Sequence, residues 1–355
     1  MTSVLLISPN WLGDFVMALP AVACFRREHP ETELHILCKP FLKPLWACVD
    51  GIREENILVF PPEGSGKKSF LQTRETFQMG FALRKKGYSS AYLLPNSFRS
   101  ALLVWLGGIG HRRGTGLHAR RLLVNDVVRF SDEENRTLHQ SREYLRILCG
   151  HTDGDLSQTG FGSRHPALPD ACRAYPEVSR WVGVIPGAAR GDSKRWPHFA
   201  AAIAKIAEQD PTVGFVLLGT KSERAIGEQA MAQIGVLRQR AIVVNAIGET
   251  RDTVAFLDAL CSCVCVLCND SGGMHLASAA GVPVVAVFGR TDPKKTGPLG
   301  RAARIIQAPG VKVSRAIRRV DPDAAAILRS IEPERVADAC CEILRAQGDG
   351  KTGGR

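Results

Sequence analysis

Short apolar runs alternate with longer amphipathic segments along the whole chain. In the first half, apolar runs predict strands near residues 4–8, 33–38, 56–60 and 91–94, and the segments between them predict helices near 15–27, 70–86 and 98–106. Strands that alternate with helices of this length are typical of βαβ units, whose strands form a parallel sheet covered by helices. The first half is therefore predicted to be an α/β domain. The stretch 61–68, rich in Pro, Gly and Lys, is predicted to be a mobile surface loop.

The alternation stops in the middle of the chain and then starts again. A helix predicted near 136–148 ends at Gly150, and the polar stretch 153–177 that follows has no periodic element. Beyond it, strands are predicted near 182–185, 213–218, 241–244, 263–267 and 282–288, and helices near 197–208, 223–233, 252–259, 274–280 and 333–345. A chain of 355 residues is longer than one hydrophobic core usually serves. We therefore predict two domains, residues 1–175 and 176–355.

The same pattern argues against a membrane-spanning or exported chain. No uninterrupted apolar run reaches the ~18 residues that suggest a transmembrane helix. The N-terminus leads directly into the apolar run at 4–7 without a basic segment or a small-residue cleavage site. The eleven cysteines are therefore predicted to be reduced thiols of a cytoplasmic protein.

Four of these cysteines, Cys261, Cys263, Cys265 and Cys268, lie close together in the sequence. They could form a metal site, or they could be small apolar residues of a buried strand. Their spacing matches neither paired C-x-x-C motifs nor a Cys/His zinc pattern. The pattern favours the buried strand, and we predict no metal or cofactor.

The chain is basic, with a net charge of +11 spread over both halves. Such a charge favours anionic partners, which could be nucleic acid, a membrane surface or small anionic molecules. Nucleic-acid binding is disfavoured because only 6% of the residues are aromatic, the basic residues are not interleaved with them, and no known binding module is recognisable.

The first motif with chemical potential, Pro-Asn-Trp-Leu-Gly-Asp, occupies residues 9–14, between the first predicted strand and helix. Parallel α/β folds place ligands at the carboxyl ends of their strands. Asp14 could face a ligand at that position, although for this residue alone the pattern favours an N-cap, a role that Asp fills well at a helix start.

A second strand-to-helix motif spans residues 186–197, with two glycines, Lys194 and Arg195 before a predicted helix. Cationic side chains at a helix N-terminus could hold a phosphate, or they could form a solvated basic turn. The motif is neither a Walker A loop nor a G-x-G-x-x-G fingerprint, which argues against ATPase and NAD-binding functions.

The third motif, residues 269–275, has the sequence Asn-Asp-Ser-Gly-Gly-Met-His. Free backbone N–H groups of Ser271, Gly272 and Gly273 at a helix start would face a phosphate. An ordinary capped helix with flexible glycines is the alternative. Two anion-binding loops in the same half favour a diphosphate ligand, whereas His275 alone is more often a packed residue.

A fourth motif, residues 94–100, follows the last strand predicted in the first half. It contains Asn96, Ser97 and Arg99, and Arg120 and Arg121 follow downstream. Arginines suit phosphates and carboxylates because the guanidinium can form two parallel hydrogen bonds. They could also be scattered surface charges, and the sequence leaves both interpretations open.

Together these motifs resemble the ADP-heptose:lipopolysaccharide heptosyltransferases of glycosyltransferase family 9, over almost the whole chain. The strings that carry the resemblance are residues 9–14, 94–102, 194–197 and 269–272. The Asn-Ser-Phe-Arg string at 96–99 is similar to the branch of the family that adds the second heptose of the inner core. The chain departs from the family pattern at 292–298, where a lysine pair stands in a loop that usually lacks one.

The resemblance implies a GT-B fold, in which two Rossmann-like domains face a central cleft. The first domain would bind the acceptor and the second the nucleotide sugar, with the C-terminal helix able to pack back on the first domain. It also implies an inverting, metal-free transfer of heptose from ADP-L-glycero-β-D-manno-heptose to the first heptose of the lipopolysaccharide core. Peripheral contact with the cytoplasmic face of the inner membrane would follow from such an acceptor, and the oligomeric state stays undetermined.

The resemblance also assigns roles to individual residues. Asp14 matches the family's general base, and Lys194 matches the lysine that stabilises departing ADP. The donor set is Arg195, Glu223, Asp270, Ser271, Gly272 and Gly273, where Glu223 matches only loosely a ribose-contacting acid. The acceptor set is Asn96, Ser97, Arg99, Arg120 and Arg121. Alternative functions are heptose transfer at another core position and a GT-B-fold nucleotide-sugar epimerase.

Overall fold

The computed structural model describes residues 2–60, 73–117, 119–159, 161, 164–236, 241–300, 302–314 and 321–349. The predicted loop at 61–68 lies outside these residues. The chain divides into two compact units, Met1–Gly162 and Ser163–Arg355. The sequence pattern placed the division between 175 and 176 instead. Arg164 explains part of this difference, because its guanidinium binds the Asp258 carboxylate and so ties the segment before 175 to the second unit.

Within its described residues, the first unit is built on a six-stranded parallel sheet of order β3-β2-β1-β4-β5-β6. Its strands are β1 (Thr2–Ile7), β2 (Thr32–Cys38), β3 (Ile57–Val59), β4 (Ser90–Leu93), β5 (His111–Thr115) and β6 (Asp126–Val128). The central strand β1 is apolar and buried along most of its length, as expected for a strand covered on both faces.

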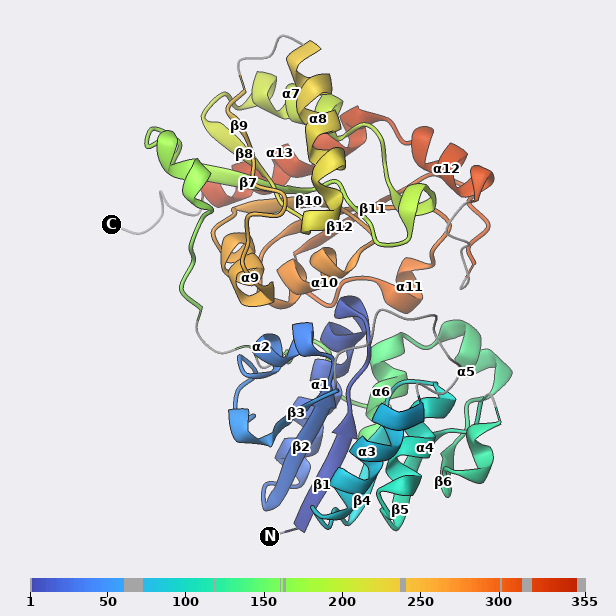
Figure 1. Ribbon diagram of the computed structural model, residues 1–355. Coiled ribbons are helices and arrows are strands. Elements are labelled where there is room, and N and C mark those ends of the chain that lie inside the picture. Colours follow the sequence, from blue (N-terminus) through green and yellow to red (C-terminus); the bar gives the residue numbers. More distant parts are fainter. Residues whose placement is uncertain are drawn as a thin grey trace. The chain divides into compact units, whose positions relative to one another are not determined.

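Helices cover this sheet in two pairs (Figure 1). One pair is α1 (Leu12–Glu28) with α6 (Gln140–Cys149), and the other is α3 (Thr73–Arg84) with α4 (Phe98–Leu106). Shorter helices are α2 (Lys43–Trp46) and α5 (Asp132–Thr137). The single helix predicted near 136–148 is thus two helices, because the chain is extended at Leu138 and His139 and the His139 side chain caps α6.

The second unit repeats the plan, with the order β12-β11-β10-β7-β8-β9 among the residues described for it. Its strands are β7 (Arg180–Ile185), β8 (Val213–Leu217), β9 (Val243–Asn245), β10 (Cys265–Asn269), β11 (Val284–Phe288) and β12 (Ala303–Gln307). Its helices are α7 (Phe199–Gln209), α8 (Arg224–Val236), α9 (Thr253–Cys261), α10 (Gly272–Ala279), α11 (Pro293–Thr296), α12 (Pro322–Arg329) and α13 (Pro333–Asp349). The C-terminal helix α13 packs against α7 and strands β10, β11 and β12 of its own unit.

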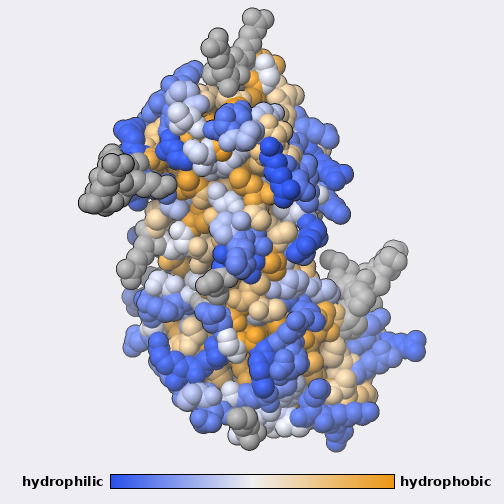
Figure 2. Space-filling model, turned by 90° about the vertical axis from the view of Figure 1, so that its left-hand side faces the viewer, coloured by the Kyte–Doolittle hydropathy of each residue, from blue (hydrophilic) through white to orange (hydrophobic). Residues whose placement is uncertain are grey.

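The fold confirms the predicted α/β class with two parallel sheets. Seen from one side, the surface mixes hydrophilic and hydrophobic residues (Figure 2). Most large apolar side chains lie inside the two units, and one exception is Trp11, whose side chain is 59% exposed. No helix in the described part of the chain has the length and apolar character needed to cross a membrane.

Candidate active site

All four motifs found in the sequence lie where the strand order of a sheet reverses. In the first unit β1 lies between β2 and β4, so the loops after β1 and β4 begin at neighbouring strand ends but lead to different helices. In the second unit β7 and β10 are neighbours in the same way. Such switch points are where open α/β sheets bind ligands. Residues 9–14 and 94–100 meet at one switch point, and residues 186–197 and 269–275 meet at the other.

Asp14 lies in the first turn of α1 but does not cap it. The N-cap residue is Trp11, whose side chain makes no capping hydrogen bond. The Asp14 carboxylate is half-buried, and its Oδ1 accepts a hydrogen bond of 3.2 Å from Gln140 Nε2 at the start of α6. An amide donor orients the carboxylate without neutralising it, which suits a group that must later take a proton.

The groups after β4 line a cavity in the first unit. The cavity is bordered by Asn10, Lys39, Phe60, Ser97, Arg99 and Ser100, among others. Arg99 Nε donates to Thr76 Oγ1 at 2.9 Å, and its guanidinium lies 5.7 Å from the centre of the Phe60 ring. Ser97 caps α4 by accepting from the Ser100 N–H. Two predicted acceptor residues, Ser97 and Arg99, therefore share one cavity with the cationic Lys39.

Asn96 was predicted from the sequence to be a site residue, whereas Lys39 was not. Asn96 Oδ1 accepts a 2.6 Å hydrogen bond from Thr115 Oγ1 on β5, so its side chain is turned toward the neighbouring strand. Lys39 follows β2 directly, at the same edge of the sheet as the motifs. Its position directly after a predicted strand could have identified Lys39 as a candidate site residue. It was missed because it does not belong to a glycine-containing motif.

Arg120 and Arg121 have opposite environments, although the sequence treated them as a pair. Arg120 is completely buried, and its Nη1 donates to the Pro95 carbonyl. Its Nε and Nη2 are buried without a hydrogen-bond partner among the described residues. Burial lowers the pKa of Arg120 from its ordinary value to about 10. Arg121 is exposed, so it is the member of the pair that solvent-borne anions can reach.

In the second unit, Lys194 and Asp270 bring the two predicted phosphate loops together. Lys194 Nζ donates to Asp270 Oδ2 at 2.5 Å, and the two side chains are 17% and 7% exposed. The Asp270 N–H itself donates to the Val287 carbonyl of β11, so the carboxylate stands on the edge of the sheet. An ammonium group has three donors, and this contact uses one of them. Asp270 therefore orients Lys194 while leaving it donors for an anion.

Asn269 holds these loops in place, a role that the sequence reasoning missed. Its Oδ1 accepts from the Trp196 N–H at 2.9 Å, and its Nδ2 donates to the Pro186 carbonyl at 2.9 Å. Asn269 is fully buried, so these hydrogen bonds are protected from water. It connects both ends of the 186–197 loop to β10. Its place inside the third motif was the signal that could have identified it.

The start of α10 carries the residues of the third motif. Ser271 is the N-cap residue, yet its side chain makes no capping hydrogen bond, and its Oγ is buried with no partner in the described part of the chain. Gly272 and Gly273 form the first turn. A Cβ on Gly273 would come within 2.6 Å of Ile185 Cδ1, so a larger residue there would force the Ile185 side chain to move.

Glu223, which follows β8, lies against the 186–197 loop. A Cβ on Gly187 would be only 2.0 Å from Glu223 Oε1, so the carboxylate is packed against the Gly187 backbone. Its Oε2 accepts from the N–H and the hydroxyl of Thr220, both at 2.8 Å. One carboxylate oxygen caps the turn before α8, and the other borders the 186–197 loop.

Arg195 lines a separate pocket, whereas its neighbour Lys194 pairs with Asp270. Arg195 lines this pocket with Trp196, Phe199, Gln229 and Arg329, between the loop and helices α7, α8 and α12. Its Nη1 lies 3.3 Å from Asp192 Oδ1. The structure thus brings Lys194, Asp270 and Ser271 together and places Arg195 in an adjacent pocket.

The Cys261–Cys268 segment forms part of the core. Cys265 and Cys268 belong to β10 and are fully buried, and burial raises the pKa of the Cys268 thiol well above its ordinary value. All four thiols are free. The buried-strand interpretation is confirmed for Cys265 and Cys268, whereas Cys261 ends α9 and is half-buried, and the buried Cys263 lies between that helix and β10.

The two parallel-sheet units with flanking helices are the arrangement found in GT-B glycosyltransferases. The structure of Escherichia coli ADP-heptose lipopolysaccharide heptosyltransferase II has a TM-score of 0.75 to this chain at 25% identity, covering 98% of this chain and all of that one. The Escherichia coli heptosyltransferase WaaC with ADP has a TM-score of 0.69 at 17% identity, covering 96% of this chain, and shows likeness of fold.

The sequence comparisons define the family. Residues 76–323 match glycosyltransferase family 9 (heptosyltransferase). The chain belongs to this family and is therefore a glycosyltransferase. It is 32% identical over 319 residues to lipopolysaccharide heptosyltransferase 2 of Escherichia coli K12, covering 86% of this chain and 87% of that protein. It is 29% identical to lipooligosaccharide heptosyltransferase 2 of Haemophilus ducreyi, with 86% and 88% covered.

Proposed function

We propose that this glycosyltransferase transfers heptose from ADP-L-glycero-β-D-manno-heptose to the first heptose of the lipopolysaccharide inner core. The observation that carries the proposal is the Lys194–Asp270 pair at the β7/β10 switch point, beside a helix start with an unpartnered Ser271 hydroxyl among the described residues. This arrangement presents positive charge and hydrogen-bond donors at one strand edge, which suits a nucleoside diphosphate. The names of the related heptosyltransferases support heptose as the transferred sugar and lipopolysaccharide as the acceptor.

The second unit would bind the donor. Lys194 and the N–H groups at the start of α10 would contact the diphosphate, and Glu223 would lie toward the ribose from its place beside Gly187. As the glycosidic bond breaks, negative charge builds up on departing ADP. Groups already fixed by Asn269 and Asp270 would stabilise that charge without costly rearrangement. In this assignment, side-chain and backbone groups of the protein stabilise ADP as it leaves.

The first unit would bind the acceptor and activate it. Asp14, held by Gln140, would take the proton of the acceptor hydroxyl as that oxygen attacks the anomeric carbon from the face opposite ADP. One displacement of this kind inverts the anomeric configuration. The cavity lined by Lys39, Ser97 and Arg99 offers cationic and polar groups for an acceptor that carries carboxylates and phosphates.

The structure refines the proposed roles of the two downstream arginines. Arg120 would act as a positioning residue, because it is buried and holds the Pro95 carbonyl before Asn96 and Ser97. Arg121 would contact acceptor anions directly. A lipid-anchored acceptor would bring the enzyme into peripheral contact with the cytoplasmic face of the inner membrane.

Two other functions of the same fold class remain as alternatives. A likeness of fold extends to a putative UDP-N-acetylglucosamine 2-epimerase from Listeria monocytogenes, with a TM-score of 0.52 at 14% identity. An epimerase would change its nucleotide sugar without any lipid acceptor. A transferase acting at another core position would use the same donor on a different acceptor.

The donor site is tested by titrating ADP into the purified protein and measuring heat. Lys194→Ala should weaken ADP binding by about tenfold or more, because the lysine neutralises diphosphate charge in the ground state as well as in the transition state. Lys205→Ala is the matched control, since Lys205 pairs with Glu334 away from the phosphate loops. Equal ADP affinity in the Lys194→Ala variant and the wild type would remove Lys194 from the site.

A further inference from the structure

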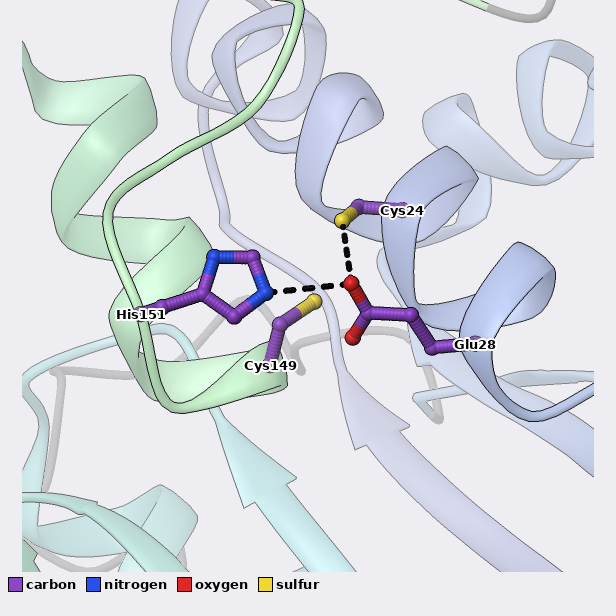
Figure 3. Close-up of side chains that lie close together, drawn as sticks. All are labelled: Cys24, Glu28, Cys149 and His151. Carbon is purple, nitrogen blue, oxygen red and sulfur yellow. Dashed lines mark hydrogen bonds and ion pairs between the residues drawn. The ribbon is translucent and has the colours of Figure 1, made fainter.

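Four side chains with metal-binding atoms gather where the carboxyl ends of α1 and α6 lie side by side (Figure 3). Cys24 and Glu28 belong to α1, Cys149 ends α6, and His151 follows it. One ligand atom of each residue lies within 4.8 Å of those of the other three. Glu28 Oε1 is 3.2 Å from Cys24 Sγ and 3.0 Å from His151 Nε2. No other group of three or more such ligands occurs within the described ranges.

The local structure explains why these residues meet. Cys24 and Glu28 are four residues apart on a helix, which places both side chains on one face. Gly150 ends α6 with a φ of +87°, a conformation that glycine adopts readily, and the chain then turns so that His151 points back toward α1. Gln140 at the start of α6 already contacts Asp14 at the start of α1. The two helices therefore run side by side in the same direction, with the four ligands at their far ends.

We propose that Cys24, Glu28, Cys149 and His151 bind one Zn²⁺ ion as a structural site. Two thiolates, an imidazole and a carboxylate are all common zinc ligands. Tetrahedral zinc requires ligand atoms about 3.3–3.8 Å apart, so small side-chain rotations bring the observed cluster to that geometry. Four protein ligands fill the coordination sphere and leave no open position for catalysis. The proposed ion is thus separate from the metal-free transfer chemistry.

The charges around the cluster also suit a zinc ion. On binding, each thiol releases its proton to water, so that two thiolates and one carboxylate face a divalent cation. The remaining negative charge is offset by Arg27, whose Nη2 lies 3.4 Å from Cys24 Sγ. Cys24 is buried and Cys149 half-buried, and burial raises the pKa of both thiols. A divalent cation would reverse that preference by stabilising the thiolates.

The site would clamp α1 to α6 in the unit that carries Asp14. The Asp14–Gln140 hydrogen bond joins the two helices at their amino ends, and the proposed ion would join them at their carboxyl ends. A metal-free group of hydrogen bonds and a Cys24–Cys149 disulfide are the competing interpretations. The disulfide would use two of the four side chains and leave Glu28 and His151 as an ion pair beside it.

The first experiment measures the zinc content of the full-length protein after incubation with Zn²⁺ and gel filtration under reducing conditions. The wild type should retain about one equivalent of zinc. The double variant Cys24→Ala, Cys149→Ala should lose it, and circular dichroism shows whether that variant is folded. Cys261→Ser is the matched control, because Cys261 is also half-buried but lies outside the cluster, and it should retain the ion. Wild type without zinc, or loss of zinc in Cys261→Ser, would overturn the proposal.

A second variant keeps the test valid should the double variant fail to fold. Glu28→His has a similar reach and produces the Cys₂His₂ ligand set of structural zinc sites. It should retain zinc, and zinc should raise its thermal midpoint. If the cluster were only a group of ion pairs, Glu28→His would lose the contact with His151 and gain no stability from zinc. Mass spectrometry of the wild type with alkylated thiols supplies the last check, because a quantitative Cys24–Cys149 disulfide after purification under mild reduction would contradict the site.

Discussion

At the scale of single residues, the proposed chemistry depends on two side chains, each oriented by a hydrogen bond with a second residue. Asp14 is a helix-start carboxylate that does not cap its helix and is oriented by Gln140. Lys194 is a largely buried ammonium held by Asp270. In each case a second residue fixes the direction of the first, which is the arrangement expected of groups that must meet a substrate in one geometry.

Asp14→Asn should fold normally and lose transfer activity by about 10²–10⁴-fold, because the amide cannot accept the acceptor's proton. The measurement is the steady-state rate with saturating donor and acceptor. Asp132→Asn serves as the control, since Asp132 is an acidic residue in the first turn of α5 and shares any helix-dipole effect. Turnover near the wild-type value in Asp14→Asn would leave Asp14 with only a structural role.

Arg120→Ala and Arg121→Ala should have different effects. Removing the buried Arg120 side chain leaves a cavity and an unpaired Pro95 carbonyl, so the free energy of unfolding should fall by about 2–4 kcal/mol. Arg121→Ala should change stability by less than about 0.5 kcal/mol, as is usual at the surface. It should raise the acceptor KM and leave the donor KM unchanged.

Denaturant unfolding and a separate titration of each substrate distinguish the two roles. A rise of the donor KM without a rise of the acceptor KM in Arg121→Ala would show that substrates are assigned to the wrong domains.

Most of the candidate site residues at the strand ends could be predicted from the sequence, but the burial and the partners of some of them could not. Asp14, Lys194, Asp270 and Ser271 lie where a recognisable strand leads into the next helix, and this position indicated them. The burial of Arg120 could not be predicted, because an Arg-Arg pair carries no periodicity that separates an inward from an outward side chain. Asn269 shows a second limit, since its partners lie more than seventy residues away in sequence.

At the scale of elements, the loops at the second switch point lie so close together that a side chain at Gly187 would displace its neighbour. Glu223 belongs to the loop after β8, yet its carboxylate touches the backbone at Gly187 in the loop after β7. The position of one loop therefore depends on the other.

Gly187→Ala should displace Glu223, because the new Cβ would lie 2.0 Å from its Oε1. We expect a several-fold rise in the donor KM and a loss of about 1 kcal/mol from weakening the Thr220 cap. Gly235→Ala provides the comparison, since a Cβ there meets nothing within 4 Å. A donor KM equal in both variants would show that Glu223 takes no part in donor binding.

The strands that the apolar pattern did not predict are polar, short or at the edge of a sheet. Strand β5 begins with His111-Arg112-Arg113, whose charges hide its alternation, and β6 has only three residues. Strand β12 is an edge strand with exposed positions. Central strands such as β1 and β10 were predicted well because burial on both faces produces a continuous apolar run.

At the scale of the whole molecule, the two units have the same sheet topology, with the motifs at equivalent strand ends. The two sheets have the same strand order, and neither has an additional strand inserted among the described residues. The sequence predicted two α/β domains because the pattern restarts after a polar stretch. It could not place the division between the units exactly, because the Arg164–Asp258 pair, which joins residues 94 positions apart, carries no local signal.

The most direct test of the account incubates the protein with ADP-L-glycero-β-D-manno-heptose and a lipid A-core acceptor that ends in a single heptose. The masses of both substrates and products are then measured. The account predicts that the acceptor gains the mass of one heptose while an equal amount of ADP is released, and that neither change occurs with an acceptor lacking the first heptose. A donor that isomerises without acceptor, or heptose added to the acceptor that lacks the first heptose, would contradict it.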